Sequence, residues 1–449
     1  MPNGRVPIAN TVQDLRPREI PLDGLPNASG RARHWHVPAS ERTVHWGYFS
    51  RSLLPIVEVA SGDYVTLECL THQAGDDPAR MIAGDPGIES VYHWTRDQKN
   101  VMRRGAGPMD APNGHGGGQG VHILTGPVGV RDAAAGDVLE VRILDMYPRP
   151  CANPEFAGRT FGTNLAANWG YHYHDLIEEP KPREVVTIYE LDAAGGDYAR
   201  PLYNYRWGPV TDPDGVVHRV YDYPGLVVDP AKYHPRHGIL PRVRVPIRPH
   251  FGTLGLAPKE VDLVSSIPPN YCGGNVDDWR IGKGATLYYT VSVEGALLSA
   301  GDTHAAQGDS ELCGTAIESS WTGLFQLILH KQHTIAEDSV LAQAGSPLLE
   351  TRDEWVVHGF SHPKYLTDLG PDAQAEVFRK SSVDLAMRDA FRKIRDFLMR
   401  VHHLSEDEAI SLISVAVDFG VTQVVDGNWG VHASLRKQIF NLSTSGSLP

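Results

Sequence analysis

The sequence lacks long apolar runs. Nowhere in its 449 residues do about eighteen apolar residues run together, which is the length that a membrane-spanning helix needs. Residues 1–7 also lack the apolar core of a secretory signal peptide. We therefore expect a soluble, cytoplasmic protein with no membrane partner.

Cysteine and positive charge are both scarce. The four cysteines, Cys69, Cys151, Cys272 and Cys313, are widely spaced and form no CxxC pair. Four cysteines in so long a chain do not make a disulfide framework, which favours a reducing compartment. The 41 basic side chains are outnumbered by 54 acidic ones, for a formal net charge of −13. Phosphate backbones attract the opposite balance, so nucleic acid is not an expected partner.

Turn-forming residues, by contrast, are abundant. The chain has 45 glycines and 33 prolines, and valine, tyrosine and threonine recur in short runs, which favours many strands joined by turns. Apolar residues take helical spacing near the C-terminus, over residues 382–402 and 405–417, and Ser405 and Glu408 form a capping box there. We predict a β-rich α+β fold with two helices packed on the sheet near the C-terminus.

The size and patterning of the chain favour two to three regions, and we divide it as follows. Residues 1–40 are rich in proline, arginine and asparagine without a clear period, which predicts an N-terminal arm, and the core is expected to start near His45. Residues 41–245 form a β-rich region. It includes a polar stretch over 71–120, with His72, His93 and His115, and inserted loops at about 150–245. Residues 246–449 form an α+β region.

The densest polar motif lies in the last region, over residues 301–314, with Glu318 shortly after it. It follows an apolar run over 295–300 that is expected to be buried, and it combines three glycines with acidic side chains and a histidine. Asp302 and His304 are two residues apart, so on a strand both would face the same side. A total of 21 histidines suggests metal or proton chemistry. The motif therefore predicts a functional site, although a polar turn at the rim of a sheet would have the same composition.

Three further motifs accompany this one, and the chain order of the four is 122–127, 249–253, 273–277 and 301–309, the last extended by Glu311, Cys313 and Glu318. Together they resemble the acetamidase/formamidase family, over roughly residues 45–435. The resemblance implies hydrolysis of a small linear amide such as formamide or acetamide, a metal-containing site, sandwich or barrel sheets with C-terminal helices, and a homo-oligomer. The chain departs from the family at Ser310, where glycine is usual. Residues 150–245 also exceed those of the short members, which leaves the substrate size open.

Amide hydrolysis needs a polarised carbonyl, an activated water and a proton for the leaving amine. We expect a divalent metal, zinc in the first place with calcium as a structural alternative. The expected ligands are His122, Asp277, Asp302, His304 and Glu318. Each has a structural alternative, since Asp302 could cap a turn and His122 could be a core histidine bonded to backbone.

Other residues are expected to act on the substrate. Glu311, and His304 beside it, are predicted to move protons, because a partly buried glutamate near a metal can reach a near-neutral pKa. Asn275, with the backbone amides of Gly273 and Gly274, could hold the substrate carbonyl or the developing oxyanion, and His250 is expected to contact substrate. The alternatives are a solvent-facing Glu311 and glycines that serve only a turn.

Two other hypotheses stay open. In the first, Cys313 is the nucleophile of a cysteine amidase, assisted by Glu311 and Lys283. In the second, the chain is a β-rich binding protein that holds a ligand without chemistry. Aromatic side chains in the long loops could also stack on a larger or aromatic amide, and these are Trp94, Trp169, Tyr171 and Trp207.

Overall fold

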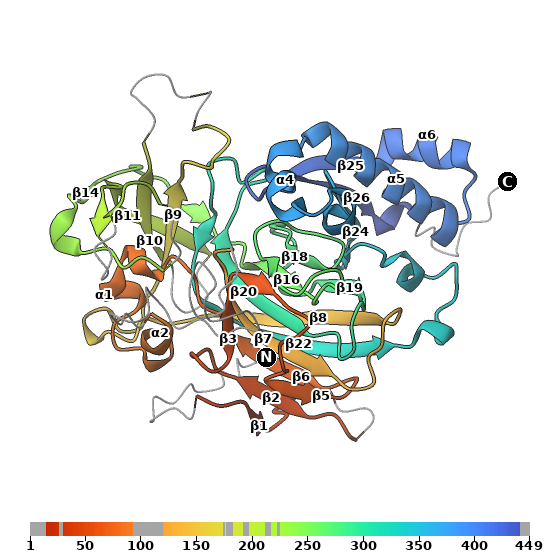
Figure 1. Cartoon of the computed structure of the whole chain (residues 1–449), viewed down its shortest axis with the longest axis horizontal. Helices are drawn as coiled ribbons and strands as arrows, with labels where there is room; N and C mark the ends of the chain where they lie inside the picture. The colour runs from red at the N-terminus through yellow and green to blue at the C-terminus, as the bar shows by residue number, and fades with distance from the viewer. Residues whose placement is uncertain are drawn as a thin grey trace.

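The computed structural model describes residues 15–26, 30–92, 120–173, 176, 183–191, 197–211, 217–221 and 225–440. Two large sheets face each other, with the C-terminal helices at one end of the molecule and the strands of residues 160–206 at the other (Figure 1). Among the helices of these described ranges, none is long and apolar enough to cross a membrane.

The first sheet has ten strands. Its spatial order is β1 (Arg18–Ile20), β2 (His34–Val37), β6 (Tyr64–Glu68), β22 (Trp321–His330), β8 (Val138–Pro148), β19 (Thr286–Thr290), β23 (Leu348–Glu350), β24 (Glu354–Phe360), β26 (Gly430–Arg436) and β25 (Val417–Gln423). Neighbouring strands run antiparallel except β2 and β6, which are parallel.

The second sheet has twelve strands and carries the polar motifs. Its main path is β14 (Arg236–His237), β11 (Tyr198–Arg206), β10 (Val185–Leu191), β9 (Thr160–Ala166), β21 (Ile317–Glu318), β20 (Leu298–Ala306), β16 (His250–Gly255) and β18 (Gly273–Asn275). Off this path, β15 (Val245–Pro246) pairs with β11, β7 (Ile123–Val130) pairs with β20, and β3 (Val44–Trp46) and β5 (Val57–Val59) pair with β7. Two small ribbons pair β12 (Val210–Thr211) with β13 (Val217–His218) and β4 (Tyr48–Phe49) with β17 (Val264–Ser265).

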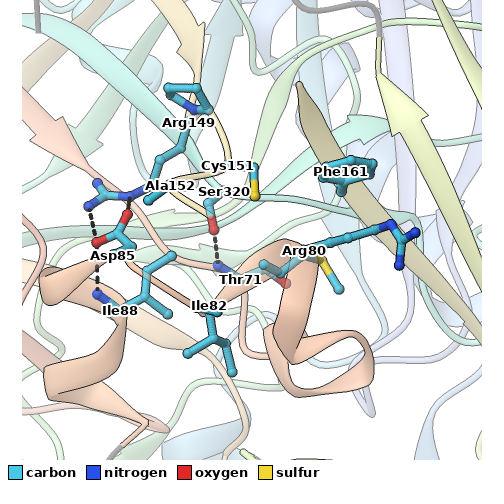
Figure 2. A pocket seen from close by; sticks show the side chains of 13 residues that line it. Thr71, Arg80, Ile82, Asp85, Ile88, Arg149, Cys151, Ala152, Phe161 and Ser320 are labelled. Carbon is cyan, nitrogen blue, oxygen red and sulfur yellow. Dashed lines mark hydrogen bonds and ion pairs between the residues drawn. The ribbon is translucent and has the colours of Figure 1, made fainter. Parts of the chain in front are cut away.

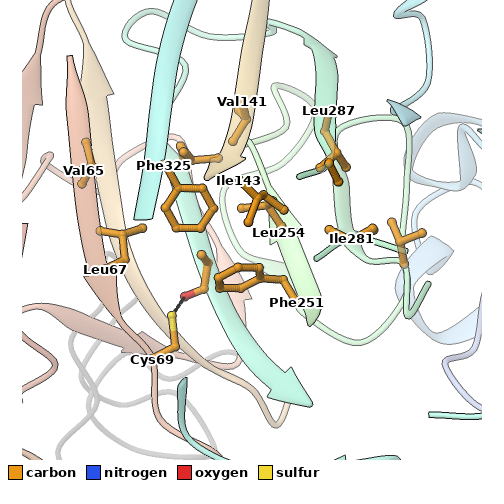
Figure 3. Packing of buried hydrophobic residues seen from close by; sticks show 14 of the residues in the cluster. Val65, Leu67, Cys69, Val141, Ile143, Phe251, Leu254, Ile281, Leu287 and Phe325 are labelled. Carbon is orange, nitrogen blue, oxygen red and sulfur yellow. Dashed lines mark hydrogen bonds between the residues drawn. The ribbon is translucent and has the colours of Figure 1, made fainter. Parts of the chain in front are cut away.

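The main core lies between the two sheets. Phe251 of β16 and Phe325 of β22 meet there with ring centroids 5.0 Å apart, and aliphatic side chains of both sheets surround them (Figure 3). The central strand β20 is buried along its whole length, which is why residues 295–300 are apolar or small. The predicted β-rich α+β class is confirmed, as a packed pair of sheets.

The helices follow the predicted pattern. They are α1 (Pro78–Met81), α2 (Pro86–Val91), α3 (Tyr365–Asp368), α4 (Ala373–Lys380), α5 (Val383–Val401) and α6 (Glu406–Ala416). The capping box of Ser405 and Glu408 starts α6. The long helix α5 packs its apolar face on β24 and β26, and a Cβ on Gly359 would collide with Ala390 of α5, so glycine permits this close approach.

Three expectations change at the level of the sheets. The core begins at His34 and not near His45, because β2 pairs with β6 and Val37 is fully buried, so residues 34–40 do not belong to an arm. The β-rich region predicted over 41–245 is divided between the two sheets, since β5 joins the second sheet and β6 the first. Residues 150–245 supply three long strands, β9 to β11, to one end of the second sheet. Such long-range pairings leave no local signature.

A buried ion network ties the end of β8 and the start of α2 to β6, and Figure 2 shows the part of it between Arg149 and Asp85. The Arg149 guanidinium donates to both oxygens of Asp85 at 2.7 and 2.9 Å and to Glu68 Oε2 at 2.5 Å. The His36 ring lies 2.9 Å from the other oxygen of Glu68. Burial alone would raise the pKa of Glu68, but Arg149 and His36 outweigh it and lower the pKa to about 2.

This network predicts a pH-dependent contribution to stability. Because the folded pKa of Glu68 lies below its ordinary 4.5, the contribution is complete above about pH 5 and is lost as the pH falls toward 2. Its full size is about 3 kcal/mol. We expect Glu68→Gln to lower the free energy of unfolding near pH 7 and the deficit to shrink at pH 3, as measured by urea unfolding. A deficit that does not change with pH would contradict this assignment.

Candidate functional site

Four neighbouring strands of the second sheet bring the polar motifs together. His304 of β20 lies opposite His250 of β16 and, on its other side, opposite Glu318 of β21. Beyond β16, Asn275 of β18 lies opposite Thr253. Because directly opposed residues project to the same face, the sheet itself aligns side chains that are far apart in the sequence.

His304 is the centre of a buried cluster. Its Nε2 atom lies 3.2 Å from Glu318 Oε1 and 3.5 Å from Asp302 Oδ1, and its Nδ1 atom lies 3.7 Å from Asp277 Oδ1. These four residues are each at most 3% exposed. The side chains of Asp302 and His304 therefore lie side by side, as their spacing on a strand predicts.

Two more histidines close the cluster around Asp302. His122 Nε2 lies 3.5 Å from Asp302 Oδ2, and His72 Nδ1 lies 3.5 Å from Asp302 Oδ1. The two rings meet edge to face at 5.2 Å. The other ring nitrogen of His122 bonds Ser266 Oγ at 2.8 Å, which orients Nε2 toward the aspartate. His93 and His115 lie outside the described residues.

Glu311 approaches from the loop after β20. It is 7% exposed, so the alternative of a solvent-facing glutamate is wrong. Asp277 and Asp426 are buried near it: besides burial, the charge of Asp277 raises the pKa of Glu311, and the charges of Asp277 and Glu311 raise the pKa of Asp426. Asp277, Asp302 and Glu311 all have positive φ angles, of 52°, 51° and 46°. Non-glycine residues avoid this backbone region, so the fold holds three site residues in strained positions.

The carboxylates of the cluster have too few positively charged neighbours for all of them to be ionised at once. Burial and neighbouring carboxylates raise the pKa of Glu311 and Asp426 well above the ordinary value and that of Glu318 to about 8. Burial would also raise the pKa of Asp302, but His122 and His304 hold it well below its usual range. The site thus favours either extra protons or a bound cation.

The donor set fits a metal ion. His72, Asp302 and Glu318 place one ligand atom each within 4.8 Å of one another, and so do Asp277, His304 and Glu311. Six buried atoms of these residues make no hydrogen bond within the described part of the chain: His72 Nδ1, Asp277 Oδ1, Asp302 Oδ1, His304 Nε2, Glu311 Oε2 and Glu318 Oε2. Unpaired buried polar atoms are costly, and imidazole and carboxylate are the ligands that zinc accepts.

Gly252 provides the room that this cluster needs. A Cβ on Gly252 would collide with the side chains of Asp277, His304 and Asp302. The 249–253 motif therefore contributes a space as well as a side chain. Any larger residue here would push the ligand atoms apart.

The residues predicted to bind substrate have different positions. Asn275 is buried with Oδ1 accepting from Thr253 Oγ1 at 2.7 Å, and its Nδ2 has no partner among the residues that the structure describes. The Gly273 N–H already donates to Asn270 O at 2.9 Å. It therefore serves a turn and is not free to bind an oxyanion. Gly274 lies beside it in β18, opposite Leu254, where a side chain on Gly274 would approach Phe49.

His250 contacts the Nδ1 side of the His304 ring and not the Nε2 side, where Glu318 lies. Its Nδ1 bonds Arg248 O at 2.6 Å and its Nε2 lies 3.0 Å from both Gln307 Oε1 and His304 Nδ1. Gln307 in turn donates to Asp277 O at 2.6 Å. The predicted substrate contact of His250 is replaced by a supporting one that orients the His304 ring.

Lys283 and Cys313 are not brought into the cluster. The Lys283 side chain is 65% exposed and pairs with Asp145 at 2.7 Å. Cys313 is exposed, and partial burial raises the pKa of its thiol, which opposes thiolate formation. The structure thus gives the cysteine hypothesis neither an activated thiol nor its lysine.

Two of the predicted aromatic residues border the Glu311 loop. Trp169 Nε1 donates to Gly314 O at 3.1 Å, and the Tyr171 amide donates to Leu312 O at 2.9 Å. Trp207 instead packs on Tyr221 at 4.7 Å. Trp94 lies outside the described residues.

Ser310 has a φ angle of 79°, the region in which glycine is favoured. We expect Ser310→Gly to raise the free energy of unfolding by up to about 1 kcal/mol, because the left-handed penalty is removed. Ser339, with a φ of −80°, is the matched control. Glycine there is expected to destabilise, and equal effects of both changes in thermal melting would contradict the assignment.

Sequence reasoning missed four members of the site, namely His72, Gly252, Gln307 and Asp426. His72 was visible only as one of three histidines in a polar stretch, and Asp426 as part of a turn between β25 and β26. The parallel bridge between Ser310 and Gln423 brings that turn to the Glu311 loop. Gly252 carried a usable signal, since it stands in a recognised motif.

The family model described as the Acetamidase/Formamidase family matches residues 119–266 and 262–442. An acetamidase of Mycolicibacterium smegmatis is 34% identical over 221 residues, which cover 44% of this chain and 50% of that protein. A formamidase of Methylophilus methylotrophus is 30% identical over 220 residues, covering 44% and 49%. The chain thus spans about half the length of these two relatives.

Solved structures share the fold. The crystal structure of an acetamidase from Bacillus halodurans aligns with a TM-score of 0.56 at 22% identity, over 90% of this chain and 98% of that one. An acetamidase from Yersinia enterocolitica aligns with a TM-score of 0.57 at 21% identity, over 89% and 90%. At this identity the likeness concerns the fold alone.

Proposed function

Because the chain belongs to the acetamidase/formamidase family, we propose that it is an amidase that hydrolyses a linear amide to a carboxylate and ammonia. The observation that carries this proposal is a buried cluster of side chains, formed by His72, His304, Asp302, Glu318 and Glu311. The ordinary alternative, a polar rim on a sheet, would be solvated and hydrogen-bonded. These groups are buried and retain unpaired atoms.

We further propose that His72, Asp302, Glu318 and His304 hold a divalent metal, with zinc as the first candidate. When bound, such an ion supplies a Lewis acid for the amide carbonyl and for the attacking water. His122 is the additional nitrogen ligand within reach of Asp302. His250 and Gln307 keep His304 Nε2 turned toward the carboxylates by occupying its Nδ1 side.

Glu311 is proposed to carry the proton. Its carboxylate accepts a proton from the attacking water as the new C–O bond forms, and then donates it to the amide nitrogen as the C–N bond breaks. Burial favours this role because it raises the pKa of Glu311 well above the ordinary value. The unpaired Nδ2 of Asn275 is the donor available for the substrate oxygen.

Ammonia release from formamide, acetamide and a panel of larger aliphatic and aromatic amides tests the proposal. We expect turnover of at least one linear amide by the zinc-loaded protein. If no amide, carbamate or ester in the panel is turned over, the enzyme hypothesis fails and the binding-protein alternative is favoured. The homo-oligomer and the cytoplasmic location stay predictions of the sequence.

The cysteine alternative has its own test. We expect Cys313→Ser to retain kcat within about twofold, because surface substitutions away from the chemistry have small effects. Cys69→Ser, at a fully buried cysteine, is the matched control for structural damage. Loss of turnover in Cys313→Ser with an unchanged melting temperature would reinstate the nucleophilic route.

A further inference from the structure

Two acids of the site come from separate turns, each tied to a strand by a backbone hydrogen bond: the Asp277 amide donates to Gly252 O of β16 at 3.2 Å, and the Ser310 amide donates to Thr422 O of β25 at 3.0 Å. Asp277 follows β18, and Glu311 follows β20. Both residues, and Ser310 between Asp309 and Glu311, have positive φ angles. Since a strained backbone persists only where the surroundings hold it, each turn needs an anchor.

A single guanidinium contacts the neighbours of both acids. Arg280 Nη1 lies 3.1 Å from Asp278 Oδ1 and 3.7 Å from Asp309 Oδ1. Asp278 directly follows Asp277, and Asp309 lies two residues before Glu311. The Arg280 side chain is 14% exposed and Asp278 is fully buried, so solvent screens their contact less than on an open surface, whereas Asp309 is 49% exposed.

The adjacent tryptophan strengthens the same bridge. Trp279 Nε1 donates to Asp309 Oδ1 at 2.8 Å, and the Arg280 guanidinium stacks on the Trp279 ring at 4.3 Å from its centroid. On its other oxygen Asp278 bonds His358 of β24 at 2.9 Å, and Asp278 is fully buried. The turn after β18 is thus anchored to the first sheet and tied to the Glu311 loop.

We propose that Arg280 is a positioning residue that fixes the Asp277 turn against the Glu311 loop and so sets where the two carboxylates stand. Arg280 itself touches neither acid in the described contacts. One nitrogen, Nη1, contacts both Asp278 and Asp309 while the guanidinium plane stacks on Trp279, and a lysine ammonium on a flexible stem does not reproduce this stacked arrangement. The kinetic part of this inference rests on the proposed amidase function.

Arg248 is a matched control. Its guanidinium stacks on the same Trp279 ring at 4.5 Å, but among the described residues it makes no ion pair with Asp278 or Asp309. Arg248→Gln removes a neighbouring cation and a stacking contact while leaving the bridge in place. It thereby separates positioning from general electrostatic or packing loss.

The test compares Arg280→Gln, Arg280→Lys and Arg248→Gln with the unchanged protein. We expect Arg280→Gln to lower kcat by about 100-fold, since small misplacement of catalytic groups has effects of that size, while KM changes little. Arg280→Lys is expected to recover only part of the loss. In Arg280→Ala, added guanidinium ion below unfolding concentrations should restore part of kcat. Arg248→Gln should stay near the unchanged protein.

A second measurement does not depend on activity. Hydrogen–deuterium exchange of peptides spanning residues 308–314 and 273–279 should be faster in Arg280→Gln and unchanged in Arg248→Gln. Equal exchange in both variants, or full kcat in Arg280→Gln, would overturn the inference. If the unchanged protein hydrolyses no amide, the proposed function fails, and the exchange data alone decide the inference. If Arg280→Gln does not fold, Arg280→Lys and Asp309→Asn carry the same comparison.

Discussion

Glu311→Gln is expected to lower kcat for amide hydrolysis by about 100- to 10,000-fold, the range over which a positioned acid–base group acts. Glutamine keeps the size and the hydrogen-bonding shape of the side chain but cannot accept and return a proton. KM should change little, because the substrate can still enter. The measurement is steady-state ammonia release at saturating amide.

Metal content decides how that loss is interpreted. Glu311 stands near Asp277 and His304, a group that could itself hold an ion, so a ligand role is the competing explanation. We expect Glu311→Gln to bind the same amount of zinc as the unchanged protein and Glu318→Gln to bind less. Loss of zinc in Glu311→Gln would assign Glu311 as a ligand. Glu294→Gln, on the surface, controls for the change of charge.

Removal of the proposed metal is the second change that we expect to have a large effect on turnover. Treatment with a chelator followed by dialysis is expected to reduce turnover to about one thousandth or less, since Lewis-acid stabilisation is worth several kcal/mol and each 1.4 kcal/mol is tenfold in rate. Addition of zinc should restore it. Addition of calcium should not restore turnover, because calcium is expected only as a structural ion.

His72 makes that experiment specific to this structure. The His72 ring contacts Asp302 across a long sequence separation, and its Nδ1 makes no hydrogen bond. We expect His72→Ala to weaken zinc binding, measured by competition with a chromogenic chelator. His330→Ala, at a partly exposed histidine that pairs with Glu140, should bind zinc normally. Chelator-resistant turnover, or normal zinc affinity in His72→Ala, would contradict the proposed centre.

The aromatic side chains bear on substrate size without deciding it. Trp169 and Tyr171 border the Glu311 loop, and Tyr171 meets the Trp429 ring at 5.9 Å. Trp207 packs on Tyr221, which in turn meets the Trp169 ring. Of the three predicted stacking residues that the structure describes, two therefore border the Glu311 loop directly, and the amide panel includes aromatic members for that reason.

Local patterning determined the class of fold and the central motif. Short runs of valine, tyrosine and threonine between turn residues predict a β-rich chain, and helical spacing with the Ser405 capping box predicts α5 and α6, because these signals depend only on neighbours in the chain. The spacing of Asp302 and His304 likewise placed them on one side of a strand. Family motifs named Glu318, Asp277 and Glu311 as companions.

Only the tertiary structure decided which residues meet. His72 joins the cluster because its segment folds back beside β20, and Asp426 joins because a turn near the C-terminus bridges to Ser310. The same long-range packing turned His250 into a support for His304 and left Lys283 at the surface. Strand pairing across a hundred or more residues depends on the whole core, and no local pattern encodes it.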